Sequence, residues 1–224
     1  NYMKKYLFWC ALEERPYSET DRRLSAKLSR ERQDKINRYR FDVDKRLSLY
    51  GGLLVRMGIQ KFWNIPYEEQ TFVCENMKKP YLVSEGNIHF NLSHTRNMIV
   101  CGYSDQPVGV DVERIKVPFH KEIVRRYRAD EQLQCQRGSE QEQASAFYQI
   151  WTKKEAYVKC DGTGLSVEVT EIPTNLPQFE TWKRGEYIIS LFSRSEAPTE
   201  LVNITEEELV YFFASDRNEN GNWN

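Results

Sequence analysis

The chain has 224 residues, enough to bury a core as one large domain or as two domains of about 100 residues each. Its apolar content of 40% excludes an intrinsically disordered chain, and its net charge of −1 excludes a protein that binds polyanions over its whole surface. The charge is uneven, because residues 1–105 carry 18 Lys and Arg against 13 Asp and Glu, whereas residues 106–224 carry 14 against 20. Residues 22–46 alone hold 10 basic and 4 acidic side chains, so a phosphate-bearing ligand is expected there.

The first half is expected to form a strand, two helices, a loop and two further strands. These elements are predicted at residues 5–11, 18–40, 44–63, 76–82, 88–94 and 98–103. Arg32 and Lys35 are three positions apart in the first helix, so their side chains share a face. This face is either an ordinary solvated helix surface with mixed charges or a clamp for phosphate.

The second half is expected to alternate in the same way. Strands are predicted at residues 108–113, 167–172, 187–192 and 209–214, helices at 118–135 and 144–160, a polar break at 137–143 and a frayed tail at 216–224. Each half therefore contains a long helix and several strands. We predict an α/β protein of two lobes, 1–105 and 106–224, which share a large interface because no low-complexity linker separates them.

The expected compartment is the cytoplasm. No run of 18 apolar residues exists to span a membrane, and the first residues lack the apolar run and cleavage site of a signal peptide. Five cysteines without CxxC spacing argue against a disulfide framework, and three histidines lack the spacing of a zinc site.

The strand at residues 108–113 carries two carboxylates on one face. Side chains alternate along a strand, so three valines point one way, whereas Gly109, Asp111 and Glu113 point the other way. The face is either exposed and hydrated, or it is buried with a cation between the two carboxylates, since buried like charges repel each other.

The helix at residues 144–160 places Trp151, Glu155 and Lys159 on nearly one face. Glu155 and Lys159 alone would be a surface ion pair worth a few tenths of a kcal/mol. Together with Asp111 and Glu113, however, Glu155 completes an all-oxygen set of the kind that Mg²⁺ prefers, and Mg²⁺ keeps positions for substrate phosphates. A metal site beside a basic helix suggests a phosphate ester or pyrophosphate as the ligand.

Several ordered segments resemble the 4′-phosphopantetheinyl transferase family. They are FNLSHT at 90–95, GVDVE at 109–113, WTKKEAYVK at 151–159 and GTGLS at 162–166, with a Lys-Pro pair at 79–80. The length and the spread of these segments are similar to the monomeric, two-lobed Sfp-type branch and unlike the short trimeric branch.

The resemblance implies two similar α/β lobes related by a pseudo-twofold axis, each a small sheet packed with a long helix. Coenzyme A (CoA) and Mg²⁺ would lie in the cleft, with the first lobe on the CoA nucleotide and the second carrying the metal and the catalytic helix. A monomeric enzyme would transfer the 4′-phosphopantetheine arm of CoA to a serine of an apo acyl or peptidyl carrier protein and release 3′,5′-ADP. The sequence does not distinguish carriers of fatty acid, polyketide or nonribosomal peptide synthesis.

The resemblance also implies roles for the acidic and basic residues of the second lobe. Asp111 and Glu155 would bind Mg²⁺ with the CoA pyrophosphate, and Glu113 would bind the ion directly or through water. Glu155 is the expected base toward the carrier serine. Lys159 would stabilise or protonate the leaving phosphate, and Lys154 would also face the phosphates.

The implied nucleotide site lies in the first lobe. Arg32, Lys35 and His94 would contact the 3′-phosphate, and Ser93 would touch the nucleotide end. The expected lining of the adenine site, largely by backbone, is Lys79 and Pro80.

Arg46 is a further candidate for phosphate binding, but its position departs from the family pattern. Members usually place an Arg directly before a Ser or Thr, whereas residues 45–52 here are KRLSLYGG. Either the helix is shifted locally or Arg46 reaches round to the phosphate.

Two other functions are compatible with parts of this pattern. One is a non-catalytic module that binds CoA or a carrier protein, although such a module has little need for four charged residues in one site. The other is a Mg²⁺-dependent hydrolase of the CoA pyrophosphate. For carrier docking, Ile123 and Tyr127 are candidates, with a core position as the alternative. The basic run at 125–128 is short and flanked by acids, so we expect no nucleic-acid partner.

Overall fold

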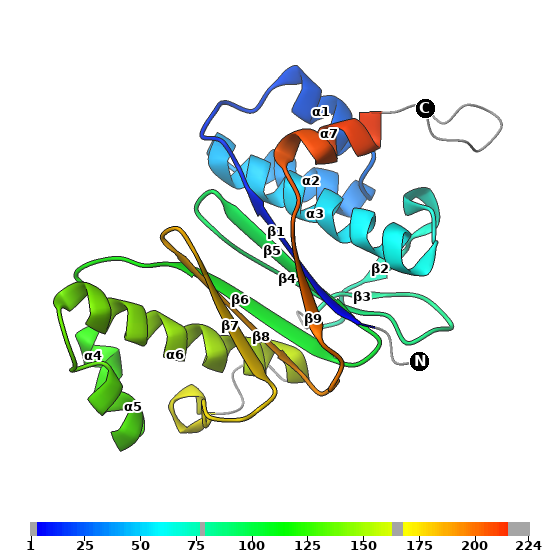
Figure 1. The fold of residues 1–224 in the computed structure, drawn as a ribbon. Coiled ribbons are helices and arrows are strands. Elements are labelled where there is room, and N and C mark those ends of the chain that lie inside the picture. Colours follow the sequence, from blue (N-terminus) through cyan, green and yellow to red (C-terminus); the bar gives the residue numbers. More distant parts are fainter. Residues whose placement is uncertain (1–3, 77–78, 163–167, 215–224) are drawn as a thin grey trace.

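The computed structural model describes residues 4–76, 79–162 and 168–214. It shows two lobes, each a β-sheet packed against one long helix (Figure 1). The first sheet has the order β4-β5-β1-β9 and the second the order β6-β8-β7. The strands are β1 (Lys5–Ala11), β4 (His89–Thr95), β5 (Met98–Ser104), β6 (Val108–Arg114), β7 (Phe179–Arg184), β8 (Tyr187–Ser193) and β9 (Thr199–Asn203). The predicted two-lobed architecture, with one sheet and one long helix per lobe, is confirmed.

The long helix of the first lobe is α3 (Asp42–Trp63), and a short ribbon of β2 (Phe72–Val73) and β3 (Tyr81–Leu82) follows it beyond the 3₁₀ turn η1 (Tyr67–Glu69). The single helix predicted at 18–40 is two helices, α1 (Glu19–Ser25) and α2 (Arg30–Arg38). The second begins because the Ser29 side chain accepts a hydrogen bond from the Arg32 backbone N–H, which caps a new helix.

The long helix of the second lobe is α6 (Glu140–Asp161). It begins four residues earlier than predicted, because Ser139 and Glu142 form a reciprocal capping box, and it ends at Gly162, which is left-handed. The helix predicted at 118–135 is likewise two short helices, α4 (Lys121–Val124) and α5 (Ala129–Gln134), on the side of α6 away from the sheet (Figure 1).

Two expectations for the last third of the chain were wrong, and two of its strands were missed. Residues 209–214 are helical and belong to α7 (Glu206–Ala214), whose buried Leu209 and Phe213 are four apart, as on one helix face. A 3₁₀ turn, η3 (Val169–Glu171), lies within the strand predicted at 167–172, of which residue 167 is outside the described residues. Strands β7 and β9 were not predicted. The tail predicted at 216–224 and part of the GTGLS segment also lie outside the described residues.

The end of the described chain returns to the first lobe. Strand β9 pairs in parallel with β1, with Leu201 opposite Leu7, and α7 packs beside α3 (Figure 1). Residues of the second half therefore complete the first sheet, so the lobes are not simply the two halves of the sequence.

The two sheets face each other across an apolar layer, and β6 lies at this seam. The layer holds Leu7, Met98, Val100, Val108, Val110, Val112, Ile189 and Leu191. The opposite face of β6 meets α6 so closely that a Cβ at Gly109 would lie 2.0 Å from the Ala156 carbonyl oxygen. Only glycine fits there, and Asp111 is thereby directed toward α6. Among the described helices, none combines the length and apolar character needed to cross a membrane.

Candidate active site

Three elements bring a hydrogen-bonded triad together at the seam between the lobes. Asp111 of β6 accepts from Lys159 Nζ of α6 at 2.7 Å and from Ser93 Oγ of β4 at 3.1 Å. Lys159 Nζ also donates to Ser93 Oγ at 3.2 Å. Asp111 is only 4% exposed, so the alternative of a hydrated carboxylate is wrong for this residue, whereas Glu113 on the same face is half-buried.

The second carboxylate oxygen of Asp111 is unsatisfied. Its Oδ2 is buried and has no hydrogen-bond partner among the described residues. Burial raises the pKa of Asp111, and the charge and hydrogen bond of Lys159 act in the opposite direction. A buried carboxylate oxygen without a partner is costly, so this position favours a cation.

Glu113 and Glu155 add negative charge beside Asp111. Burial, followed by the charge of Asp111, raises the pKa of Glu113 to about 7. The same two causes, in the same order, raise the pKa of Glu155. In the part of the chain that the structure describes, no three acidic, His or Cys side chains form a ready-made metal cage. The donors are nevertheless all oxygen, and the unpaired Oδ2 and the raised pKa values are what Mg²⁺ would relieve, so the residues fit this ion.

Two adjoining cavities form a groove in the first lobe, which we call the cationic groove. The larger cavity, of about 260 Å³, and the smaller, of about 210 Å³, share Arg32, Lys35, Pro80, Phe90 and Leu92. The remaining lining of the smaller cavity is Tyr39, Leu47, Ser48, Lys79, Asn91 and His94. The structure thus brings together the predicted nucleotide-binding residues of the first lobe except Ser93 and Arg46, since Ser93 bonds to Asp111 instead.

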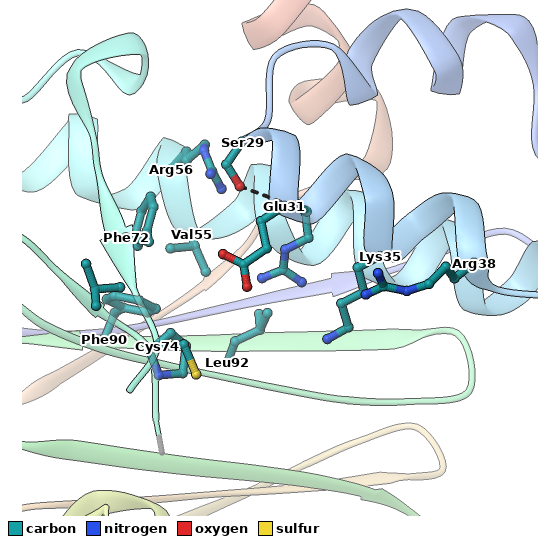
Figure 2. A pocket seen from close by; sticks show the side chains of 13 residues that line it. Ser29, Glu31, Lys35, Arg38, Val55, Arg56, Phe72, Cys74, Phe90 and Leu92 are labelled. Atoms are coloured by element: carbon teal, nitrogen blue, oxygen red, sulfur yellow. Dashed lines mark hydrogen bonds between the residues drawn. The ribbon is translucent and has the colours of Figure 1, made fainter. Parts of the chain in front are cut away.

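The groove concentrates positive charge. Burial lowers the pKa of Lys35, and the neighbouring charge of Arg32 lowers it further. Burial, followed by the charge of Lys159, lowers the pKa of His94. Burial also lowers the pKa of Lys79 to about 8, and its Nζ donates to the carbonyl oxygen of Val108. Cations that outnumber the acids in a hollow favour an anionic ligand, and the one described acid that lines the two cavities is Glu31 (Figure 2).

Several groove residues were not predicted from the sequence, among them two polar residues of α3. Ser48 of α3 accepts from Arg32 Nη1 at 3.4 Å and lines the smaller cavity. Arg56 lies further along α3 and lines the larger cavity. It is 5% exposed, and its guanidinium lies 4.6 Å from the Phe72 ring centroid. Ser48 could have been found from the Ser or Thr of the family pattern, whereas Arg56 stands in the apolar run LLVRMG and gives no such signal.

Lys154 does not face the phosphates, contrary to expectation. It is fully buried on another side of α6, where Nζ lies 2.9 Å from Glu131 Oε2. It also donates to the carbonyl oxygens of Thr170 at 3.1 Å and Ile172 at 2.7 Å. Adjacent helix positions are turned by about 100°, so Lys154 cannot share the direction of Glu155. Its role here is to hold α5 and η3 against α6.

Arg46 is also directed away from the groove. It is 2% exposed, donates to the carbonyl oxygen of Glu13 and pairs with the Glu206 carboxylate of α7. Its Nε lies 3.7 Å from Asp21 Oδ2 of α1. Arg46 therefore belongs to a buried ionic cluster that joins α1, α3 and α7, which accounts for its departure from the family pattern. The predicted contact of Arg46 with a phosphate was wrong.

Of the two docking candidates on 118–135, one is a core residue. Tyr127 is 4% exposed and stacks on Phe147, and Ile123 is partly buried in the same cluster. The alternative of a core position holds for Tyr127, whereas Ile123 is only partly buried and remains a docking candidate.

Comparison with known proteins identifies the class of enzyme that this arrangement serves. A model of the 4′-phosphopantetheinyl transferase superfamily matches residues 107–211, and one described as 4′-phosphopantetheinyl transferase, N-terminal, matches residues 14–104. The chain belongs to this family and to its two-domain, Sfp-like type, as the sequence segments had indicated.

Three relatives show how far the similarity extends. The chain is 34% identical over 158 residues to 4′-phosphopantetheinyl transferase gsp of Aneurinibacillus migulanus, covering 70% of this chain and 66% of the relative. It is 30% identical over 167 residues to 4′-phosphopantetheinyl transferase Sfp of Bacillus subtilis, covering 74% of each. It is 33% identical to psf-1 of Bacillus pumilus, with 67% and 65% covered. The alignments span about two thirds to three quarters of these relatives. Together with the two family models, they show that the chain is an enzyme that transfers 4′-phosphopantetheine from CoA to carrier proteins.

Proposed function

We propose that the chain carries out Mg²⁺-dependent transfer to a serine hydroxyl of an apo carrier protein at the seam, with release of 3′,5′-ADP. The observation that supports this most strongly is the junction at β4. Ser93 bonds to Asp111, which with Glu113 and Glu155 forms what we call the acidic cluster. The next residue, His94, lines the cationic groove. CoA has a phosphorylated nucleotide and a pyrophosphate, so it would match a cationic groove that adjoins an acidic cluster.

The nucleotide end of CoA would lie in the cationic groove. Arg32 and Lys35 face the smaller cavity from α2, and His94 faces it from β4. We assign the 3′-phosphate to these three residues, because it needs concentrated positive charge and N–H donors. The pyrophosphate would then extend past Ser93 toward Asp111.

Asp111, Glu113 and Glu155 are the proposed ligands of Mg²⁺. When bound, the ion would neutralise charge on the pyrophosphate and on the phosphorus under attack. Glu155 accepts the proton of the carrier serine, and because a bound cation keeps this carboxylate ionised, it contributes mainly by orienting the serine hydroxyl. The serine oxygen bonds to the phosphorus that bears the pantetheine arm, while the bond from that phosphorus to the bridging oxygen breaks. Lys159, which must leave Asp111, stabilises or protonates the departing 5′-phosphate of 3′,5′-ADP.

We further propose a cytoplasmic, monomeric enzyme. The five cysteines are all free, which suits a reducing compartment. One chain supplies both the cationic groove and the acidic cluster, so a second copy is not needed to complete the site.

The test is incubation of an apo carrier protein with the enzyme, CoA and Mg²⁺, followed by measurement of the carrier mass. We expect one phosphopantetheine arm on the serine, and none when the serine is replaced by alanine. An unmodified carrier, in conditions where Sfp of Bacillus subtilis modifies it, would contradict the proposal. Free phosphopantetheine in place of modified carrier would instead support the hydrolase, and CoA binding without either product would support the non-catalytic module.

A further inference from the structure

We propose that Lys159 is an internal counterion of the acidic cluster, which keeps divalent cations weakly bound until CoA draws its ammonium group away from Asp111. The inference deepens the proposed function and rests on it, because it assumes that CoA and the cation meet at this cluster. It concerns the protein before CoA binds and the order in which the two ligands bind, rather than the role of Lys159 in the transfer step.

The contacts of Lys159 are concentrated on one oxygen of Asp111. The Lys159 Nζ lies 2.7 Å from Asp111 Oδ1, and Ser93 Oγ donates to the same oxygen at 3.1 Å. Lys159 Nζ also donates to Ser93 Oγ at 3.2 Å. The second oxygen, Oδ2, is buried without a hydrogen-bond partner among the described residues. A cation that reaches Oδ2 must therefore approach an ammonium group already bound to the same carboxylate, and like charges at such range repel strongly in a buried site.

The charge of Lys159 also acts on the other two acids of the cluster. Burial, followed by the charge of Asp111, raises the pKa of both Glu113 and Glu155, and the charge of Lys159 opposes this rise in both. Before CoA binds, Lys159 thus supplies positive charge to all three carboxylates, as a metal ion would do. A divalent cation must compete with Lys159 for that negative charge.

The two partners differ in their freedom to move. The Asp111 side chain is 6% exposed and lies on β6 within the sheet, whereas the Lys159 side chain is 32% exposed near the end of α6. Lys159 can therefore leave Asp111 without a change in the fold. Among the described residues its hydrogen-bond partners are Asp111 and Ser93, so its release needs a new acceptor. The CoA pyrophosphate offers such an acceptor.

The binding of CoA and of the cation should consequently be coupled. CoA that holds the Lys159 ammonium group leaves Asp111 free for the cation, so CoA raises the affinity for the cation beyond what its own phosphate oxygens contribute. Coupling of this kind is reciprocal, so the cation should raise the affinity for CoA by the same factor. In a variant without the ammonium group, this part of the coupling is lost.

The experiment is titration of Mn²⁺ into the protein with and without CoA, followed by electron paramagnetic resonance, which does not depend on catalysis. Without CoA, Lys159→Met should bind Mn²⁺ about tenfold more tightly than the wild type, within the usual range of coupling between sites. With CoA, this difference should fall below about threefold. The matched control is Lys116→Met, because Lys116 is exposed and its charge acts on Glu113 without a bond to Asp111. It should change the affinity by less than about twofold.

Thermal unfolding provides a second measurement without CoA. Lys159→Met leaves Asp111 without its cation, so its unfolding midpoint should be lower than that of the wild type. Mn²⁺ should then raise the midpoint of Lys159→Met more than that of the wild type, because a ligand that binds the folded state more tightly stabilises it more. Lys159→Gln, which keeps a hydrogen-bond donor but no charge, should behave in the same way.

Equal Mn²⁺ affinities of the wild type and Lys159→Met without CoA would overturn the inference. An equal gain in Lys116→Met would also overturn it, since removal of any nearby charge would then be enough. A tenfold gain that persists with CoA would show that CoA does not draw Lys159 away from Asp111. Normal transfer to a carrier with any of these results would contradict this inference alone, whereas CoA-dependent Mn²⁺ binding without transfer would contradict the proposed function alone.

Discussion

The cationic groove and the acidic cluster are neighbours, but the groove is an open hollow, whereas Asp111 of the cluster is bonded to Lys159. The groove is hollow, and Lys35 and Arg56 line its larger cavity without an ion pair among the described residues. The acidic cluster is closed, because Lys159 occupies Asp111 Oδ1 at 2.7 Å and Ser93 bonds to both residues. Asp111 Oδ2 is one of the buried polar atoms left without a hydrogen-bond partner among the described residues.

The difference suggests that the two sites meet their ligand in different ways. The groove has its shape and charge before CoA binds, so the nucleotide end needs little rearrangement. At the cluster, Lys159 must exchange Asp111 for a phosphate, and the carboxylates must gather around a cation. Binding and chemistry should therefore separate on mutation, and four predictions test this separation.

The largest effect is expected at the acidic cluster. Asp111→Asn and Glu155→Gln should each lower the rate of transfer by about 10³-fold, because charge stabilisation at the phosphorus is lost. Both variants should remain folded and should still bind adenosine 3′,5′-bisphosphate, as measured by calorimetry. Glu122→Gln, which changes a highly exposed acid of α4, is the matched control. Transfer at the wild-type rate in either cluster variant would remove that residue from the proposed site.

The next effect is on stability, at Lys154. Lys154→Met should lower the free energy of unfolding by about 3 kcal/mol, because it removes the nearest cation from the buried Glu131 and leaves it only the more distant Arg128, at 3.8 Å. The double change Lys154→Met with Glu131→Leu should recover much of this loss, and urea unfolding measures both. Folded Lys154→Met should still transfer. A Lys154→Met variant of normal stability that cannot transfer would instead support the predicted contact of Lys154 with the CoA phosphates.

A smaller effect should distinguish the arginines of the first lobe. Arg32→Ala should raise the KM for CoA about tenfold with little change in stability, because its guanidinium lines both cavities. Arg46→Met should instead lower the free energy of unfolding and leave the KM unchanged, because Arg46 pairs with Glu206 and Asp21. Exchange of these two phenotypes would show that Arg46 does contact the nucleotide.

The smallest effect concerns pH. Because burial lowers the pKa of Lys79 to about 8, the unfolded chain binds the proton more tightly than the folded protein does. The contribution of neutral Lys79 to stability is present above pH 10.5 and is lost as the pH falls through 8. Between pH 8 and 10.5, the wild-type free energy of unfolding should therefore rise relative to Lys79→Met by about 1 kcal/mol, allowing for partial exposure. Parallel curves for the two proteins would contradict the assigned pKa shift.

Regular patterns in the sequence were sufficient to predict the strand and the helix that meet at the seam between the lobes. The alternation from Val108 to Glu113 correctly predicted a strand with valines on one side and carboxylates on the other. Spacing along the helix correctly placed Lys159 toward that strand. The C-terminal helix was missed because its glutamates were not recognised as a helix start, although Thr205 and Glu208 exchange the hydrogen bonds of a capping box.

The errors at the site come from direction and from long-range packing. Lys154 stands next to Glu155 in sequence, but one helical step turns it toward Glu131, a residue 23 positions earlier. Arg46 is fixed by Glu206, which no local pattern connects to it. Whether a charged side chain meets a ligand or a buried partner is decided by such distant contacts, so residue type and spacing alone could not separate the two cases.

The unpaired oxygen of Asp111 is expected to accept a divalent cation when CoA is bound. The direct measurement is titration of Mn²⁺, as a spectroscopic substitute for Mg²⁺, into the protein with CoA, followed by electron paramagnetic resonance. We expect one bound ion per wild-type chain and strongly weakened binding in Asp111→Asn. Equal Mn²⁺ binding by the two proteins would contradict this expectation.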